Sequence, residues 1–398
     1  MTLEFRQGGT AYDITVSRGS LSLAGSLFNL RRKILVVTGE GVPPQYAQTV
    51  LSQCPEGWLL TIPEGEANKT LTSVELILGA LLEHGFTRSD AVVAVGGGVI
   101  GDTAGFAAAC YMRGIDWYNV PTTLLSQADS SVGGKTGVNL HGVKNIAGAF
   151  HQPSGVLIDP DTLDTISPRL FSEGLAEIIK MAATSDAALF QLLETAPDLR
   201  PLMEQVLTSA LSIKIHVVSQ DPTEHNLRAV LNFGHTIGHA IEGVAACGTE
   251  AGVVSGDRLR PRSREWEGPA GIRWTDESLL SDGQRIPVGG MRTEGPKSSG
   301  NNFSEVEQKA FYHGEAVAVG MLYMAEGEAN RRIEKLLKKY NLPTEDPYTT
   351  EQLMTYAAHD KKRRGGTIKL VRVSEIGTFR FQEATPEDLR TIIQARKK

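Results

Sequence analysis

Two continuous apolar runs with a helical segment between them constrain the fold of this chain more than any other feature. KILVVTG at 33–39 and AVVAVGGG at 91–98 are rich in valine and carry no internal charge, which is typical of strands buried on both faces of a parallel sheet. SVELILGALLEHG at 73–85 has apolar residues at helical spacing and a glycine stop after His84. This order of strand, helix and strand predicts a βαβ unit and an α/β fold.

The second half of the chain changes to a helical period. Ser167 followed by Pro168 is typical of a helix start, and Thr385-Pro386 repeats this signal ahead of EDLRTIIQARKK. RLFSEGLAEIIKMAA, ALFQLLE and LMEQVLTSALSIKIHVV all have helical spacing. Since 398 residues are too many for one ordinary core, we expect a Rossmann-like βαβ domain over 1–160 and a mainly α-helical domain over 161–398.

Residues 247–308 interrupt the helical half. This segment is rich in Gly, Arg, Ser and Pro and has no sustained period, so it cannot bury much apolar surface. We expect a solvated, largely disordered insertion. An appended binding segment and a stretch of translated non-coding sequence are the alternatives that the composition leaves open.

Composition excludes several classes of protein. A formal net charge of −6 argues against general binding to nucleic acid or to anionic membranes. The three cysteines (Cys54, Cys110 and Cys247) form no paired framework, which favours a reducing compartment. The start MTLEFRQGG has no signal-peptide pattern, and no run of 18 apolar residues exists. We therefore expect a cytoplasmic protein.

The glycines after the second apolar run match a dinucleotide-binding pattern. GGGVIG at 96–101 is a G-x-G-x-x-G sequence directly after a strand, where backbone N–H groups approach a pyrophosphate at the start of the next helix. A tight strand-to-helix turn without a ligand is the alternative. Asp116 has roughly the spacing of a ribose-binding acid, but its setting in GIDWYNV is typical of a strand entry, so we expect a structural role.

The segment VPTTLLSQADSSVGGKTGVNLHGVKNIAGAFHQP at 120–153 is dense in polar side chains and glycine. Asp129, Lys135, Lys144 and Asn145 are candidates to face one cleft. The alternative is a hydrated surface loop, but loops of this length inside a compact domain are usually functional.

Histidines and glutamates in the second half indicate a metal site. His235 and His239 are four apart in NFGHTIGHA and share a helix face, with Gly234 and Gly238 permitting close approach of another element. Glu177 and Lys180 are three apart, so a surface ion pair is the alternative there. His313 and Glu315 are candidates to complete the site. Oxygen and nitrogen ligands without a thiolate suit zinc or a similar divalent ion, although the spacing does not say which two histidines bind it.

Many cations accompany these motifs in an acidic protein, which suggests an anionic and phosphorylated substrate. With a nucleotide cofactor and a metal site, the reaction class would be metal-assisted alcohol oxidation with hydride transfer. The candidate cations are Arg113, Lys135, Lys180, Lys214, Arg228, Lys361 and Lys362.

Six longer motifs resemble the 3-dehydroquinate synthase family. They are GGGVIGDTAGFAAACYMRGI, VPTTLLSQADSSVGGKTGVN, KNIAGAFHQP, GLAEIIK, LNFGHTIGHAIE and HGEAVAVGM, and the resemblance covers roughly residues 60–245 and 311–398. It implies conversion of 3-deoxy-D-arabino-heptulosonate 7-phosphate to 3-dehydroquinate and phosphate, the second step of the shikimate pathway. It also implies catalytic NAD, a divalent metal (usually zinc, with cobalt as the alternative) and a homodimer without nucleic-acid or membrane partners.

The resemblance assigns roles to individual residues. Glu177, His235 and His313 match the metal ligands. The positions that match catalytic residues are Lys135, Asn145, Lys180 and His239. Those that match the substrate site are Arg113, Asp129, Lys214, Arg228 and Asn232, with Lys361 or Lys362. Those that match the cofactor site are Glu66, Lys69, Gly97, Gly98, Asp102, Thr122, Thr123 and Lys144.

The sequence departs from the family pattern in two places. The family's first strand usually ends in an acid and an asparagine that contact the adenosine, whereas Gly39 and Gly41 stand here, with Glu40 between them as a candidate substitute. The second departure is the insertion at 247–308, where the family has a short turn. The competing functions are a related sugar-phosphate cyclase, a metal-dependent alcohol dehydrogenase and an inactive homologue disrupted by the insertion.

Overall fold

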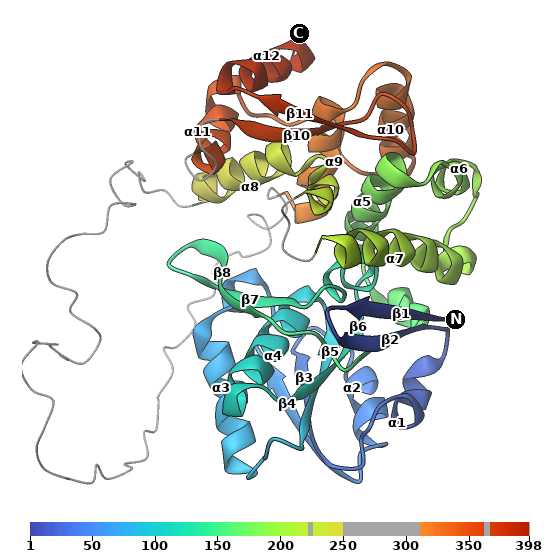
Figure 1. Cartoon of the computed structure of the whole chain (residues 1–398), viewed down its shortest axis with the longest axis vertical. Helices are drawn as coiled ribbons and strands as arrows, with labels where there is room; N and C mark the ends of the chain where they lie inside the picture. Colours follow the sequence, from blue (N-terminus) through green and yellow to red (C-terminus); the bar gives the residue numbers. More distant parts are fainter. Residues whose placement is uncertain (222–225, 250–310, 362–366, 398) are drawn as a thin grey trace, which may run out of the picture. The chain divides into compact units, whose positions relative to one another are not determined.

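The computed structural model describes residues 1–221, 226–249, 311–361 and 367–397 (Figure 1). Most of residues 247–308, together with Lys362, therefore lies outside the described residues. The described chain from Met1 to Val244 and from Phe311 onward forms one compact unit. The predicted boundary near residue 160 stays a prediction, because contacts do not divide this unit.

A seven-stranded sheet carries the first part of the chain, in the order β1-β2-β9-β6-β5-β3-β4. β1 pairs with β2 antiparallel, and every other neighbouring pair is parallel. The strands of this sheet are β1 (Thr2–Gln7), β2 (Thr10–Val16), β3 (Lys33–Gly39), β4 (Glu56–Ile62), β5 (Ala91–Gly96), β6 (Asp116–Pro121) and β9 (Gly155–Ile158). The α/β class is confirmed, and both apolar runs of the sequence are central strands of the sheet.

Helices on the two faces of the sheet explain why these runs are apolar throughout. Along β5, Val92 and Ala94 belong to one buried cluster, which includes α3 and α4. Val93 and Val95 belong to another, which includes α1 and α2 (Figure 1). Successive side chains of a strand point to opposite faces, so a strand covered on both sides needs apolar residues at every position. The bounds are α1 (Ala24–Leu27), α2 (Pro44–Leu51), α3 (Leu71–Glu83) and α4 (Gly98–Cys110).

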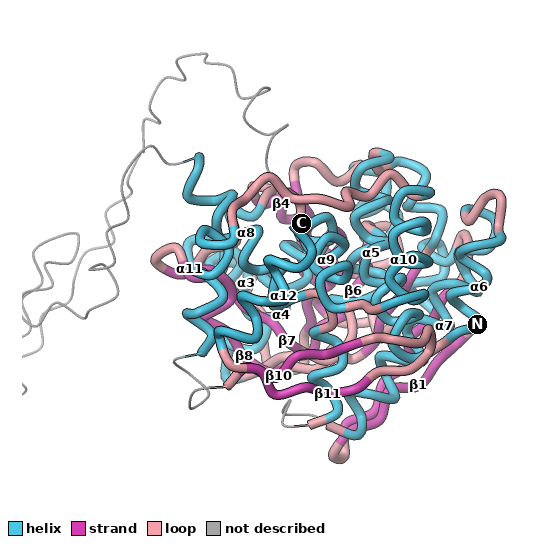
Figure 2. Tube along the Cα trace, turned by 90° about the horizontal axis from the view of Figure 1, so that it is seen from above, coloured by secondary structure: helices cyan, strands magenta, loops and turns pink. Residues whose placement is uncertain are grey.

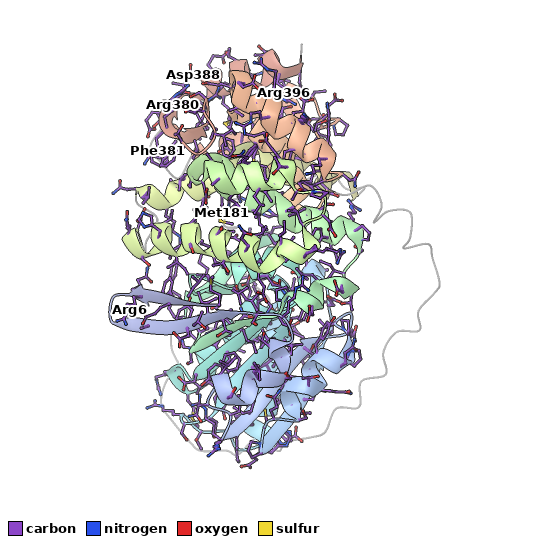
Figure 3. The ribbon with its side chains drawn as sticks, turned by 90° about the vertical axis from the view of Figure 1, so that its right-hand side faces the viewer. Arg6, Met181, Arg380, Phe381, Asp388 and Arg396 are labelled. Atoms are coloured by element: carbon purple, nitrogen blue, oxygen red, sulfur yellow. The ribbon has the colours of Figure 1, made fainter. Side chains whose placement is uncertain are left out.

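The rest of the described chain is mainly helical. Its core contains α5, where Met181 is fully buried (Figure 3), together with apolar residues of β1 and β2. A hairpin of β10 (Ile368–Arg372) and β11 (Arg380–Ala384), which helical spacing does not predict, pairs antiparallel in this half (Figure 2). The helices are α5 (Pro168–Ser185), α6 (Ala187–Thr195), α7 (Met203–Gln220), α8 (His235–Thr249), α9 (His313–Met324), α10 (Gly327–Lys339), α11 (Thr350–Lys361) and α12 (Pro386–Lys397). None of the described helices combines the length and apolar character that a membrane span requires.

The segment 120–153 is not one long loop. It contains a π-helical turn at Ser126–Ser130 and an antiparallel hairpin of β7 (Lys135–Leu140) and β8 (Val143–Phe150). The polar residues and glycines of this segment hide the alternating pattern that would have predicted strands. Gly148 is required by the close pairing of the two strands, because an added Cβ would lie 2.2 Å from the carbonyl oxygen of Thr136 on β7. The hairpin carries Lys135 at the start of β7 and Lys144 and Asn145 on β8, where the pairing register shifts and Asn145 has a φ of 53°.

Candidate active site

Three side chains from three helices meet at one point. Glu177 lies on α5, His235 begins α8 and His313 begins α9. The Nε2 atoms of both histidines lie 3.6 Å from Oε1 of Glu177. Two ligands bonded at about 2.05 Å to a tetrahedral ion are about 3.3 Å apart, so this spacing suits a metal at the centre of the group.

The chemistry of these three residues also fits a divalent cation. Glu177 is fully buried, and its Oε1 has no hydrogen-bond donor among the described residues. A buried carboxylate oxygen without a donor is costly unless a cation compensates for it. Lys180 pairs with Oε2, which leaves Oε1 facing the two imidazoles. The group therefore offers one oxygen and two nitrogens, which suit zinc or cobalt.

Glycines allow α8 and α9 to approach closely enough to bring the histidines together. A Cβ added at Gly320 of α9 would lie 2.0 Å from the carbonyl oxygen of Gly234, and one at Gly238 would lie 3.1 Å from Cα of Val317. The rings of His235 and His313 are 5.3 Å apart as a result. The close approach expected at Gly234 and Gly238 is present, and Gly320 is its counterpart on the other helix.

The environment sets the charge of each ligand. Burial lowers the pKa of His235 to about 3, so this imidazole is neutral and ready to bind a metal. Burial would also lower the pKa of His313, but the neighbouring carboxylates of Glu177 and Glu242 raise it to about 10. Burial would raise the pKa of Glu177, yet Lys180 and the two histidines hold it well below its usual value. A metal bound here must therefore displace a proton from His313.

The start of α9 is fastened to α5 by a second set of contacts. Glu315 accepts hydrogen bonds from the Arg169 guanidinium at 2.6 and 2.8 Å and from the backbone N–H of Tyr312 at 2.9 Å. Arg169 also lies over the Tyr312 ring, 4.0 Å from its centroid. Glu315 therefore holds the helix that carries His313, and it does not belong to the metal-binding group that the sequence suggested for it.

Besides Lys180, two buried cations lie on elements that pack against α5. Lys214 of α7 pairs with Asp129 at 2.5 Å. Burial lowers the pKa of Lys214, and the charge of Lys214 lowers the pKa of Asp129 although burial opposes this. Arg228 is buried too, and a Cβ added at Gly133 would lie 3.3 Å from its Nη2. Such a set of buried cations suits an anionic ligand.

The candidate cofactor residues gather at the carboxyl edge of the sheet. Gly97 and Gly98 stand at the N-terminus of α4, where added Cβ atoms would lie 3.1 Å from side chains of Thr123 and Ser130. Thr122 is buried and donates its backbone N–H to Gly96. The helix N-terminus and the lack of side chains leave backbone N–H groups accessible to a phosphate.

Lys69 connects the cofactor and substrate candidates. Its ammonium donates to Asp102 and to Asn145, both at 2.6 Å. Burial raises the pKa of Asp102, although Lys69 opposes this shift. Glu66 accepts a hydrogen bond from Asn139 at 2.9 Å, a contact that the sequence analysis did not anticipate.

The remaining candidates lie at the hairpin and in turns. Lys135 begins β7 and is exposed. Arg113 and Asn145 both have positive φ angles, 69° and 53°, which are rare for residues with a side chain and cluster at functional sites. Asn232 ends a 3₁₀ turn ahead of α8, and Lys361 ends α11 with its side chain outside the described residues. Asp116 has the expected structural role, because Arg32 donates to it at 2.6 Å.

Two acids that sequence reasoning missed also lie here. A Cβ added at Gly41 would lie 1.7 Å from Oε2 of Glu64, so the carboxylate after β4 occupies the space beside this glycine, while Glu40 is exposed. Glu242 of α8 contacts Nδ1 of His313 at 3.3 Å. Its spacing of three from His239 was the available signal, because such residues share a helix face.

Comparisons with known proteins agree with the motifs. Residues 59–173 match the family model described as 3-dehydroquinate synthase N-terminal. Residues 174–251 and 302–363 match the one described as 3-dehydroquinate synthase C-terminal, which leaves residues 252–301 of the insertion unmatched.

Curated relatives cover nearly the whole chain. The 3-dehydroquinate synthase of Enterococcus faecalis (strain ATCC 47077 / OG1RF) is 35% identical over 96% of this chain and 96% of its own length. That of Streptococcus suis (strain 05ZYH33) is 33% identical over 99% and 100%.

Solved structures show the same fold. A 2-deoxy-scyllo-inosose synthase complexed with carbaglucose-6-phosphate, NAD⁺ and Co²⁺ has a TM-score of 0.75 at 22% identity and covers 99% of this chain and 100% of its own. The 2-epi-5-epi-valiolone synthase from Streptomyces hygroscopicus subsp. jinggangensis 5008, with NAD⁺ and Zn²⁺ bound, has a TM-score of 0.75 at 24% identity, covering 99% of each chain.

Proposed function

The chain belongs to the 3-dehydroquinate synthase family, and we propose that it converts 3-deoxy-D-arabino-heptulosonate 7-phosphate to 3-dehydroquinate and phosphate. This is the second step of the shikimate pathway, which leads to chorismate and the aromatic amino acids. The observation that carries the proposal is the convergence of Glu177, His235 and His313 beside a set of buried cations. Such a site suits a phosphorylated hydroxy acid that needs both a metal and charge neutralisation.

The enzyme depends on NAD and on a divalent metal ion, zinc or cobalt. NAD would supply reversible hydride transfer, and a metal ion would supply Lewis-acid polarisation of a substrate oxygen. Glu177, His235 and His313 would hold the metal through one oxygen and two nitrogens. Gly97 and Gly98 would present the N-terminus of α4 to the pyrophosphate of the cofactor.

The buried cations bind and orient the substrate. Lys180, Lys214 and Arg228 neutralise its carboxylate and phosphate, and their burial strengthens each interaction relative to water. Asp129 keeps Lys214 charged and directed by accepting from it at 2.5 Å. Lys135, exposed at the start of β7, and Asn145, held by Lys69, approach the substrate from the hairpin.

His239 is the residue that we expect to transfer protons near the metal. Its imidazole is exposed, and its ring centroid lies 5.3 Å from that of His235 and 5.9 Å from that of His313. A histidine beside the metal-binding group can donate or accept a proton in catalysis without being a metal ligand. Phosphate leaves after loss of the proton next to the oxidised carbon, and the departing phosphate itself can take that proton.

Particular observations weigh against the competing functions. A simple metal-dependent alcohol dehydrogenase has no need of Lys180, Lys214 and Arg228 buried together. An inactive homologue disrupted by the insertion would not keep two imidazole nitrogens at 3.6 Å from one carboxylate oxygen. A related sugar-phosphate cyclase shares these features, so the substrate must be tested directly. We also propose that the protein acts in the cytoplasm as a homodimer, which light scattering of the purified protein and cell fractionation would test.

The decisive experiment measures phosphate release from the heptulosonate phosphate by the full-length protein supplied with NAD and Zn²⁺. We expect turnover that a chelator abolishes and that Zn²⁺ or Co²⁺ restores, with 3-dehydroquinate identified by NMR. A hexose 6-phosphate is the comparison substrate. Cyclisation of the hexose phosphate with no turnover of the heptulosonate would contradict the proposal and favour a related cyclase.

A further inference from the structure

Glu242 lies between the metal-binding group and the β7–β8 hairpin. It is on α8, three residues after His239, and only 11% of its side chain is exposed. Oε2 of Glu242 lies 3.3 Å from Nδ1 of His313, and Oε1 accepts a hydrogen bond at 2.9 Å from Nζ of Lys144 on β8. A buried carboxylate with both oxygens engaged in this way has a defined orientation.

We propose that Glu242 is a positioning residue that holds the His313 imidazole in the tautomer and orientation needed for metal binding. This inference rests on the proposed function to the extent that it assumes a divalent metal at Glu177, His235 and His313. A neutral imidazole carries one proton, on either nitrogen. With that proton on Nδ1 and donated to Glu242, the lone pair of Nε2 is free to bind a metal beside Oε1 of Glu177, which lies 3.6 Å from Nε2.

The other histidine of the group is held in the same way. Nδ1 of His235 lies 3.3 Å from the backbone carbonyl oxygen of Phe233, and its Nε2 also faces Glu177. Each imidazole thus has an oxygen acceptor at Nδ1 and the metal position at Nε2. His313 is the one that depends on a side chain for this acceptor. It is also the more exposed, at 33% against 13% for His235, so it has more freedom to turn.

A direct role of Glu242 as a ligand is the competing interpretation. His239, Glu242 and His313 also have ligand atoms within 4.8 Å of one another. That arrangement would use Nδ1 of His313 and an exposed histidine, and it would leave the buried Oε1 of Glu177 with no hydrogen-bond donor among the described residues. The positioning role keeps Glu177 at the metal, so we favour it.

The test uses the full-length protein, first stripped of metal and then titrated with Co²⁺ in the absence of substrate. The variants are Glu242→Ala and Glu242→Gln, with Lys144→Ala as the control that removes the other partner of the carboxylate. Co²⁺ affinity by competition with a chromogenic chelator and the visible absorption bands of the bound ion are the readouts. The melting temperature of each metal-free protein separates loss of positioning from loss of fold.

Glu242→Ala should weaken Co²⁺ binding about 10–100-fold, as expected when a histidine ligand loses its supporting partner, and should shift the absorption bands. Glu242→Gln, which retains an acceptor oxygen, should recover part of the affinity. Lys144→Ala should change it less than about fivefold, because 58% of its side chain is exposed. The metal-free proteins should melt at similar temperatures.

Several results would overturn the inference. If Glu242→Ala binds Co²⁺ with wild-type affinity and unchanged absorption bands, His313 needs no partner at Nδ1. If both Glu242→Ala and Glu242→Gln lose Co²⁺ binding completely, Glu242 is itself a ligand. A large fall in the melting temperature of metal-free Glu242→Ala that accounts for the weaker binding would make its role structural. If the wild-type protein binds no Co²⁺, then Glu177, His235 and His313 do not form a metal site and the inference fails. If the wild type binds Co²⁺ as expected but forms no 3-dehydroquinate, the proposed function fails and the positioning role stands.

Discussion

Replacing Gly320 by alanine tests whether close contact between α8 and α9 assembles the metal site. The added Cβ would lie 2.0 Å from the carbonyl oxygen of Gly234 and 2.9 Å from the backbone nitrogen of Gly238. Both neighbours are backbone atoms, so no side-chain rotation relieves the clash. Since real Cβ contacts almost never fall below 3.0 Å, the two helices must separate by about 1 Å.

The structure allows both consequences of this separation to be estimated. Overpacking of a buried contact costs about 1–3 kcal/mol of unfolding free energy, which exceeds the ~0.8 kcal/mol gained from one buried methyl group. Because His235 begins α8 and His313 begins α9, this separation also moves the two imidazoles apart by about 1 Å from their present centroid distance of 5.3 Å. Metal–nitrogen bonds are close to about 2.1 Å, so one ion cannot keep both imidazole nitrogens at bonding distance after such a shift unless the side chains move as well. We expect metal affinity to fall by at least about 10–100-fold, since loss of a supporting partner alone costs that much.

Urea unfolding and chelator competition measure the two effects. Gly79→Ala is the matched control, because Gly79 is an exposed glycine of α3 whose added Cβ would meet nothing within 4 Å. That change should stabilise the protein by about 0.5–1 kcal/mol, as alanine is the better helix former. If Gly320→Ala unfolds at the wild-type urea concentration and binds zinc with wild-type affinity, the helices are not in backbone contact and our account of the site is wrong.

Three further predictions address the substrate site, the insertion and the dependence of stability on pH. Arg228→Ala and Lys135→Ala should each lower kcat/KM by the equivalent of about 2–5 kcal/mol while the protein stays folded. The control Lys338→Ala, at an exposed residue, should leave kcat/KM unchanged. Near-normal kinetics in the first two variants would refute their contact with substrate. Deleting residues 252–301, which match neither family model, should leave phosphate release and zinc content intact, and loss of metal from the shortened protein would make the segment structural. Burial would raise the pKa of Glu326, but Arg372 and Arg380 (the latter labelled in Figure 3) lower it below its usual value. The ionised carboxylate therefore stabilises the fold at pH values above its unfolded pKa of about 4.3, and this stabilisation is lost as the pH falls through the lower folded pKa. The stability difference between wild type and Glu326→Gln should therefore shrink from pH 6 to pH 3, and a constant difference would contradict the ion-pair assignment.

Features that depend on neighbours in the chain were readable from the sequence. The apolar runs became β3 and β5, and the helical pattern between them became α3, which ends at Glu83 before Gly85 adopts a φ of 60°. Ser167 caps α5 by accepting from the N–H of Leu170, as its place before Pro168 predicted. These outcomes follow from strand alternation, helix period and capping, which act over a few residues.

Contacts between distant parts of the chain needed the tertiary structure. The helix spacing of four made His235 and His239 equivalent, and only the tertiary structure shows that Nε2 of His235 lies 3.6 Å from Oε1 of Glu177 on α5. The contacts of Lys69 with Asp102 and Asn145 and of Glu64 with the space beside Gly41 were likewise invisible. The sequence placed Glu242 on the helix face of His239 but did not reveal its contact with His313. The physical reason is that a side chain acquires its partners, its burial and its charge from elements that fold against it. Local sequence specifies which helix or strand carries a residue, whereas the approach of two elements, here permitted by Gly234 and Gly320, decides what that residue can bind.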